Sequence, residues 1–319
     1  MSHESRTAPS LGQAVKQSWA RFLDVYEPLR PELYRYCRHL TRSPWDAEDM
    51  SQDAMARAYV TLGCMAEPPP NPRAWLFRVA SNLWLNRTRQ AREVLSDGRQ
   101  WPESEPLAPS AERREAREAA GTLIAQLSPQ ERAAVVLKDV FEMSLEEVAE
   151  SLSTSAGAVK AALHRGRGKL VEPSLEEPSA VAPAVLDAFC EAFNAGDLPR
   201  LTGLLLENAS MEFPGVMIEY GAPALREGSL RSTLLGCPEG RYRPAVPPRC
   251  EVRVHRGEAI LLWWAGTEVD AVVRVELDGD RIARFTNYRH SPDLASELCG
   301  ELGVPFLKHG YQPSMESKQ

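Results

Sequence analysis

Two helix-start signals near the middle of the chain constrain its fold more than any other feature. Ser128 is followed by Pro129 and Glu131, and Ser144 is followed three residues later by Glu147. A serine whose side chain accepts the third backbone N–H of a helix, with a glutamate there that reaches back, forms a capping box. Proline is also favoured at the first helical position. The sequence therefore predicts two short consecutive helices, each with a defined first residue.

A turn and a further helix follow these two. Residues 153–155 (Ser-Thr-Ser) interrupt the helical pattern, and Val159 and Leu163 then mark an apolar side. Short helices joined by a tight turn form a helix-turn-helix, whose second helix has the dimensions to enter the major groove of DNA. The expected DNA contacts on that helix and its cap are Ser155, Lys160, His164, Arg165 and Arg167. A plain helical hairpin with a basic face is the alternative interpretation.

Composition is that of a soluble globular protein with two or three domains: 319 residues, 43% hydrophobic and 25% charged. No apolar run is long enough to cross a bilayer and the N-terminus has no signal-peptide core. We therefore expect a cytoplasmic protein without membrane contact. The six cysteines include no CxxC pair, which argues against a zinc ribbon and a disulfide framework. We expect reduced thiols, no metal and no cofactor.

The net charge of −7 hides three blocks of segregated charge. Residues 46–53 carry four carboxylates, whereas residues 73–92 carry five arginines and no acid. Residues 154–170 are also basic and contain no acid. Three such blocks favour two surfaces for polyanions and one for a basic protein over three merely solvated helix faces.

Two helices in the first part of the chain carry the acidic block and the arginine block. Asp46 is expected to cap the first helix, which leaves Glu48, Gln52 and Asp53 on its surface. Residues 71–72 (Asn-Pro) start the second, whose expected core stripe is Trp75, Leu76, Val79 and Leu83. The arginines and amides of the second helix suit single-stranded DNA, whose bases are exposed. Its tryptophans are more often core residues than stacking platforms.

Two Pro-rich segments divide the chain. We expect a helical domain over 15–93, a linker over 94–115, a helix-turn-helix domain over 116–171, a second linker over 172–183, a mixed domain over 184–290 and a tail over 291–319. The mixed domain opens with a helical pattern and ends in strand-like runs. Tight turns are expected at Arg256-Gly257 and at Gly279. The fold class is multidomain, with two all-α domains followed by an α+β domain that ends in an antiparallel meander.

These segments resemble the sigma factors of bacterial RNA polymerase, in particular the extracytoplasmic-function (ECF) group. DAEDMSQDAMARAY (46–59) resembles the σ2 helix that docks on the polymerase clamp helices. PRAWLFRVASNLWLNRTRQ (72–90) is similar to the σ2 segment that melts and reads the −10 promoter element, and residues 127–170 resemble the σ4 domain that reads the −35 element.

The resemblance implies a factor that binds the RNA polymerase core and directs initiation at specific promoter DNA. The implied polymerase contacts are Asp46, Glu48, Asp49, Gln52 and Asp53. The implied −10 contacts are Trp75, Asn82, Asn86, Arg87, Arg89 and Arg92. The implied −35 contacts are Ser155 and the four basic residues of the helix that follows it.

The mixed domain resembles the SnoaL-like, NTF2-like cone that is fused to some sigma factors. The resemblance rests on the FNAGD turn (193–197) and the strand run RIARFTNYRH (281–290), and the Gly-rich DGGGR motif of the best-known fused group is absent. It implies a domain that tunes transcription in place of a separate anti-sigma protein. A concave pocket lined by Phe213, Trp263 and Trp264 would hold a small-molecule ligand.

Two other functions stay open at this point. The first is a helix-turn-helix transcriptional regulator with a ligand-sensing C-terminal domain, which would bind DNA without polymerase. The second is an enzyme of the NTF2-like class, which needs a base in an apolar pocket. Its candidate residues are Asp187, Asp270, His255, Tyr288 and His290. Because they form no readable acid–base pair, we expect no catalysis.

Overall fold

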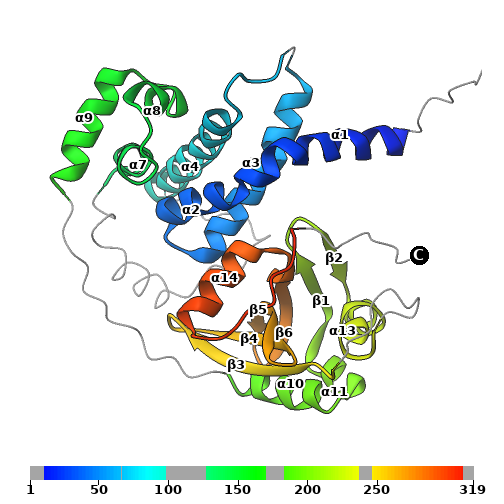
Figure 1. Cartoon of the computed structure of the whole chain (residues 1–319). Coiled ribbons are helices and arrows are strands. Elements are labelled where there is room, and N and C mark those ends of the chain that lie inside the picture. Colours follow the sequence, from blue (N-terminus) through cyan, green and yellow to red (C-terminus); the bar gives the residue numbers. More distant parts are fainter. Residues whose placement is uncertain (1–10, 66, 98–126, 170–182, 237–245, 312–319) are drawn as a thin grey trace, which may run out of the picture. The chain divides into compact units, whose positions relative to one another are not determined.

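The computed structural model describes residues 11–65, 67–97, 127–169, 183–236 and 246–311. The chain divides into two compact units, residues 1–175 and residues 176–319, each described by itself (Figure 1). Most of both expected linkers lies outside the described residues. Within the described ranges, no helix is both long and apolar enough to cross a membrane.

The first part of the N-terminal unit is a helical bundle. Its elements are α1 (Leu11–Tyr26), the 3₁₀ helix η1 (Glu27–Leu29), α2 (Arg30–Thr41), α3 (Pro44–Gly63) and α4 (Pro72–Asp97). The core lies between α2, α3 and α4, and its largest fully buried side chains are Leu33, Tyr36, Leu40, Met50, Leu76 and Phe77. The Tyr36 hydroxyl lies 2.8 Å from Ser81 Oγ, which satisfies this buried polar pair. The predicted core stripe of α4 is confirmed, because all four of its residues are buried.

The two predicted helix starts in this bundle differ in outcome. α4 begins at Pro72 as predicted, and Asn71 Oδ1 accepts the N–H of the third helical residue at 3.0 Å. α3 begins at Pro44 instead, because Ser43 is the N-cap and its hydroxyl accepts the N–H of Asp46 at 3.2 Å. The prediction that Asp46 is the cap is therefore wrong. Asp46 lies in the first turn, where its charge complements the helix dipole.

The helix-turn-helix is formed by α7 (Pro129–Val135), the π-helical turn η2 (Val136–Val140), α8 (Leu145–Ser151) and α9 (Ala156–Arg167). Both predicted capping boxes are confirmed, since Ser128 with Glu131 and Ser144 with Glu147 exchange both hydrogen bonds. Gly166 allows α9 to approach α7 closely. A Cβ on Gly166 would lie only 2.9 Å from Cγ2 of Val135. A larger residue there would push the two helices apart.

Within the same unit, the helix-turn-helix packs on the bundle. The Phe141 ring meets the Tyr36 and Phe77 rings edge-on, at centroid distances of 5.8 Å and 5.3 Å. Arg78 of α4 donates to the backbone oxygen and the carboxylate of Glu150 at the end of α8, each at 3.0 Å. Arg132 of α7 donates to the Leu40 carbonyl at 2.7 Å. The packing of the helix-turn-helix on the bundle thus combines aromatic ring contacts with hydrogen bonds.

The C-terminal unit is built on a six-stranded sheet with the order β2-β1-β6-β5-β4-β3. Its strands are β1 (Leu205–Phe213), β2 (Met217–Tyr220), β3 (Arg249–His255), β4 (Glu258–Ala265), β5 (Glu268–Asp278) and β6 (Arg281–Asn287). Strands β3 to β6 form the predicted antiparallel meander, with left-handed residues at Arg256, Gly257 and Gly279 in its turns. β1, which precedes the meander, pairs in parallel with β6, a pairing that the sequence did not predict.

Helices pack on this sheet. They are α10 (Ala184–Asn194), α11 (Leu198–Gly203), α12 (Ala222–Leu225), the π-helical turn η3 (Arg226–Leu230), α13 (Arg231–Leu235), the 3₁₀ turn η4 (Tyr288–His290) and α14 (Pro292–Glu301). The main core joins α10 to the sheet through Phe189, Phe193 and Trp263. The C-terminal segment, whose partner could not be read from the sequence, packs on β5, where Leu307 N–H donates to the Val269 carbonyl at 2.9 Å.

Candidate nucleic-acid interface

The outer face of α9 carries the predicted −35 residues. Ser155 caps the helix, and its hydroxyl accepts the N–H of Ala158 at 3.2 Å. Lys160 and His164 are exposed, and neither makes an ion pair or hydrogen bond with any other described residue. Their donors therefore point to solvent with nothing to compete for them.

The two arginines of this face are already engaged. Arg165 donates to Glu131 at 3.0 Å, and Arg167 forms a two-armed ion pair with Asp139. Both arginines remain at least half exposed. They hold α9 on α7 and η2, so contact with DNA would require sharing or exchange of their carboxylate partners.

A shallow hollow of about 360 Å³ adjoins Lys160 and His164. Its other lining residues are Lys138, Leu145, Leu163 and Arg167. Three cationic side chains and an imidazole thus surround a small open depression with an apolar floor. Such a setting suits an anion the size of a phosphate.

Glu131 provides the electrostatic support for α9. Its side chain is only 5% exposed and accepts from the Ser128 N–H, from Arg165 and from Lys169 at 2.9 to 3.0 Å. Burial by itself raises the pKa of this carboxyl, but Lys169, the Ser128 N–H and Arg165 outweigh it and hold the pKa at about 2. Glu131 is therefore ionised throughout the physiological range.

The exposed face of α4 carries part of the predicted −10 set. Asn82, Asn86 and Arg89 are exposed, and Arg89 donates to the Asn86 side-chain oxygen at 3.2 Å. Arg87 forms an ion pair with Asp53 of α3. The side chain of Arg92 lies outside the described residues. The amides stand four residues apart and therefore share one side of the helix.

Trp75 lies in the core rather than on this face. It is 7% exposed and meets the Tyr26 ring edge-on at 5.7 Å. Its ring has no open side on which a base would stack. Trp84 is half-buried, with the Arg132 guanidinium 5.5 Å from its ring.

The acidic face of α3 contains most, but not all, of the predicted polymerase contacts. Asp46, Asp49 and Asp53 are exposed and Gln52 is partly exposed. Glu48 differs from the surface position that helix spacing predicted, because it is fully buried. It forms an ion pair with Arg30 at 2.9 Å and accepts from Gln52 at 2.8 Å. Its role here is to hold α2 on α3.

Sequence reasoning missed the residues that join α4 to the helix-turn-helix. Arg78 belongs to the arginine block but was assigned no contact, and its partner Glu150 lies 72 residues away. Phe141 stands just after η2 as a large apolar residue at a predicted helix end, which was the one available signal. Only its meeting with Tyr36 and Phe77 shows what it packs against.

In the C-terminal unit the predicted pocket residues do not share one site. Trp263 belongs to the main core and Phe213 packs against that core. Trp264 lies outside this cluster, with the Arg249 guanidinium 4.7 Å from its ring. Neighbouring strand residues face opposite sides of a sheet, which explains the separation.

The residues considered for catalysis are bound to partners or lie apart. His255 pairs with Glu301. Asp270 pairs with Arg289 at 3.0 Å and with His309 at 2.9 Å. His290 Nδ1 lies 3.1 Å from the Gly310 carbonyl. Tyr288 is buried, and Asp187 lies in the first turn of α10. Two of these contacts, at His309 and Gly310, fasten the C-terminal segment to β5 and η4.

Comparison with known proteins identifies the family. Residues 25–94 match the family described as Sigma-70 region 2, and residues 117–170 match the family described as Sigma-70, region 4. The RNA polymerase sigma-E factor of Streptomyces coelicolor is 37% identical over 143 residues, which cover 44% of this chain and 78% of that protein. The chain belongs to the sigma-70 family of transcription factors.

Within that family the chain is similar to several proteins named ECF RNA polymerase sigma factors. The ECF RNA polymerase sigma factor SigG of Mycobacterium tuberculosis is 32% identical over 222 residues, which cover 59% of this chain. The chain spans 60% of the length of SigG.

Two solved structures illustrate the structural similarities of the chain. The structure of M. tuberculosis SigJ matches 83% of this chain and 95% of that chain, with 22% identity and a TM-score of 0.32. An NTF-2 like protein from Burkholderia xenovorans LB400 matches 33% of this chain and 79% of that chain, with 20% identity and a TM-score of 0.25.

Proposed function

We propose that this chain binds the core of bacterial RNA polymerase and directs initiation at specific promoters, with α9 on the −35 element and α4 on the −10 element. One observation carries the proposal: a single unit presents two faces with exposed polar side chains, Lys160 and His164 on α9 and Asn82 and Asn86 on α4. Both faces stand on helices whose opposite sides are buried. Their side chains are therefore presented by rigid supports.

On α9, Lys160 and His164 are the side chains that read base edges. Both donate to the acceptor atoms that guanine and adenine expose in the major groove. Lys138 and Arg167, on the adjoining hollow, take a backbone phosphate. Arg165 positions the helix through Glu131 and contributes charge near the backbone.

On α4, Asn82, Asn86 and Arg89 hold the single-stranded −10 bases. Asparagine offers both a donor and an acceptor to the edge of an unpaired base. Extruding a base from the duplex costs a few kcal/mol, and the favourable free energy of these contacts must offset that cost. Arg87 and Arg92 supply charge for the backbone of the strand.

On α3, Asp46, Asp49 and Asp53 form the polymerase contact, with Gln52 beside them. Three exposed carboxylates suit a basic protein surface and speed its encounter with the chain. Glu48 acts from inside the bundle by fixing Arg30 and Gln52.

Run-off transcription with purified core polymerase tests this function. We expect transcripts with defined starts only when core and the full chain are both present. Lys160→Ala with His164→Ala should lower specific transcripts about tenfold or more, since each base contact contributes about 1–3 kcal/mol. Arg35→Ala, an exposed arginine on α2, is the matched control and should keep full activity. A DNA footprint without core would instead support the helix-turn-helix regulator, and no initiation at all would refute the sigma function.

The C-terminal unit tunes this activity. Its own compact core supports this role. Residues 1–171 should therefore fold and initiate transcription at a level that differs from that of the full chain. Equal activity of the two proteins at equal concentration would contradict the tuning role.

A further inference from the structure

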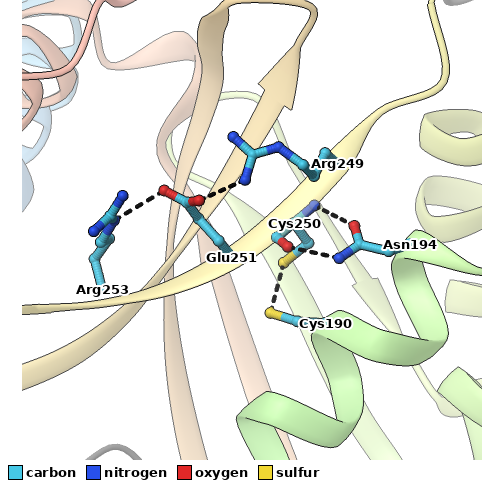
Figure 2. Close-up of polar contacts among 6 residues, drawn as sticks. All are labelled: Cys190, Asn194, Arg249, Cys250, Glu251 and Arg253. Carbon is cyan, nitrogen blue, oxygen red and sulfur yellow. Dashed lines mark hydrogen bonds and ion pairs between the residues drawn. The ribbon is translucent and has the colours of Figure 1, made fainter.

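Two cysteines that lie 60 residues apart in the sequence meet inside the C-terminal unit (Figure 2). Cys190 lies on α10 and Cys250 lies at the start of β3, and their Sγ atoms are 3.2 Å apart. Both are free thiols, and they are only 8% and 2% exposed. A disulfide needs the sulfurs about 2.05 Å apart, so a small side-chain rotation suffices and no search through the chain is required.

The backbone around this thiol pair is held in place by Asn194. Its amide nitrogen donates to the Cys250 carbonyl at 3.0 Å, and its oxygen accepts the Cys250 N–H at 2.7 Å. Figure 2 shows this two-way bond between the end of α10 and β3. β3 is an edge strand with β4 on one side, so Asn194 takes the place of a neighbouring strand on the other. The two cysteines are thus fixed on elements that already touch.

The surroundings of the Cys250 thiol combine burial with a nearby indole N–H. Burial, together with the nearby Cys190 sulfur, raises the pKa of the Cys250 thiol, while the Trp263 indole N–H lowers it by less. Trp263 is paired with Cys250 across β3 and β4. Its buried N–H has no partner other than the Cys250 sulfur among the described residues, so it can stabilise negative charge there. No third His, Cys, Asp or Glu among the described residues completes a metal site.

We propose that Cys190 and Cys250 form a reversible disulfide when the chain meets a peroxide, which ties α10 to the edge strand β3. The Cys190 thiol gives up its proton as its sulfur attacks one peroxide oxygen, the O–O bond breaks, and the leaving hydroxide takes that proton and departs as water, which gives a sulfenic acid. The Cys250 sulfur then attacks the Cys190 sulfur, the S–O bond breaks and a second water leaves with the Cys250 proton. Two thiols lose two electrons in total and one peroxide gains them. A dithiol reductant reverses the reaction through a mixed disulfide.

The link should stabilise the C-terminal unit. A cross-link across 60 residues removes much of the loop entropy of the unfolded chain. For a unit of this size we expect its melting temperature to rise by roughly 10 °C. The exposed Cys64 serves as an internal reference, since a thiol in solvent reacts without any opening of the fold.

The test treats the full chain with hydrogen peroxide, blocks remaining thiols by alkylation and maps the peptides by mass spectrometry. We expect one cross-linked pair, Cys190 with Cys250, lacking two hydrogens, together with the rise in melting temperature and its loss after dithiothreitol. Cys299→Ser removes a buried cysteine elsewhere in the unit and should change neither result. Cys190→Ser should abolish the rise. Full oxidation of Cys64 while Cys190 and Cys250 stay alkylatable, or a link from either to a different cysteine, would overturn the proposal.

Discussion

Replacing Glu131 by glutamine removes one negative charge from the centre of the helix-turn-helix and little else. Glutamine has nearly the same size and still accepts the Ser128 N–H of the capping box. It no longer attracts Arg165 and Lys169, which both reach this carboxylate. The substitution therefore isolates the charge from the cap and from the packing.

The pKa of Glu131 sets the size of the effect. The carboxyl has a pKa of about 2 in the folded chain against an ordinary value of 4.5. Since one pKa unit corresponds to 1.36 kcal/mol, the ionised group stabilises the fold by about 3 kcal/mol at neutral pH. Because the folded-state pKa is the lower one, this contribution is complete above pH 4.5 and is lost as the pH falls towards 2. At pH 3 roughly 1 kcal/mol remains.

Amide hydrogen exchange in α7 and α9 measures the stability of the helix-turn-helix locally. The result therefore does not depend on the stability of the C-terminal unit. We expect Glu131→Gln to lower the opening free energy by about 3 kcal/mol at pH 7 and by roughly 1 kcal/mol at pH 3. Glu147→Gln in the second capping box is the matched control. The pKa of Glu147 is lowered mainly by the Ser144 backbone and hydroxyl rather than by a bound cation, so its loss should stay below about 1 kcal/mol. Equal losses for Glu131→Gln at both pH values, or equal losses in the two boxes, would refute the electrostatic reasoning.

Three further predictions concern single side chains. Gly157→Ala should raise the stability of α9 by about 0.5–1 kcal/mol, since a Cβ there meets only Ser155 Oγ at 3.9 Å; a lower melting temperature would contradict this. Phe141→Ala should weaken the packing of the helix-turn-helix on the bundle by about 1–2 kcal/mol, seen as faster hydrogen exchange in α4, and unchanged exchange would show that the rings contribute nothing. Asn86→Ala should slow promoter melting in a permanganate assay. Because the side chain is exposed, the melting temperature of the protein should stay within about 1 °C. An equal loss of transcription on a pre-melted promoter would show that Asn86 does not act in promoter melting.

Features set by a few neighbouring residues could be predicted from the sequence. The capping boxes at Ser128 and Ser144 depend on contacts three residues apart, and the turn at Arg256-Gly257 depends on two residues with positive φ. Each is decided locally, whatever the rest of the chain does. The Asp46 error shows the limit of this logic, because Ser43 and Pro44 offered an equally local and better start.

Features set by distant partners could not be predicted in the same way. Helix spacing placed Glu48 on the surface, and only the approach of Arg30 shows that it is buried. The pairing of β1 with β6 joins segments more than 70 residues apart, which periodicity within one strand does not reveal. Trp263 and Trp264 are different, since alternation along a strand already implies that neighbours point apart.

The ion pair between Arg78 and Glu150 places a competitor for DNA on the chain itself. Arg78, Asn82 and Asn86 stand at four-residue intervals on α4, so the carboxylate of Glu150 lies at one end of the row proposed to hold the −10 strand. A DNA phosphate that approaches Arg78 must displace this carboxylate. Every 1.4 kcal/mol by which the closed contact is preferred lowers the apparent affinity for DNA tenfold. On the proposed function, Arg78 is thus held by the protein's own acid until a DNA phosphate takes its place.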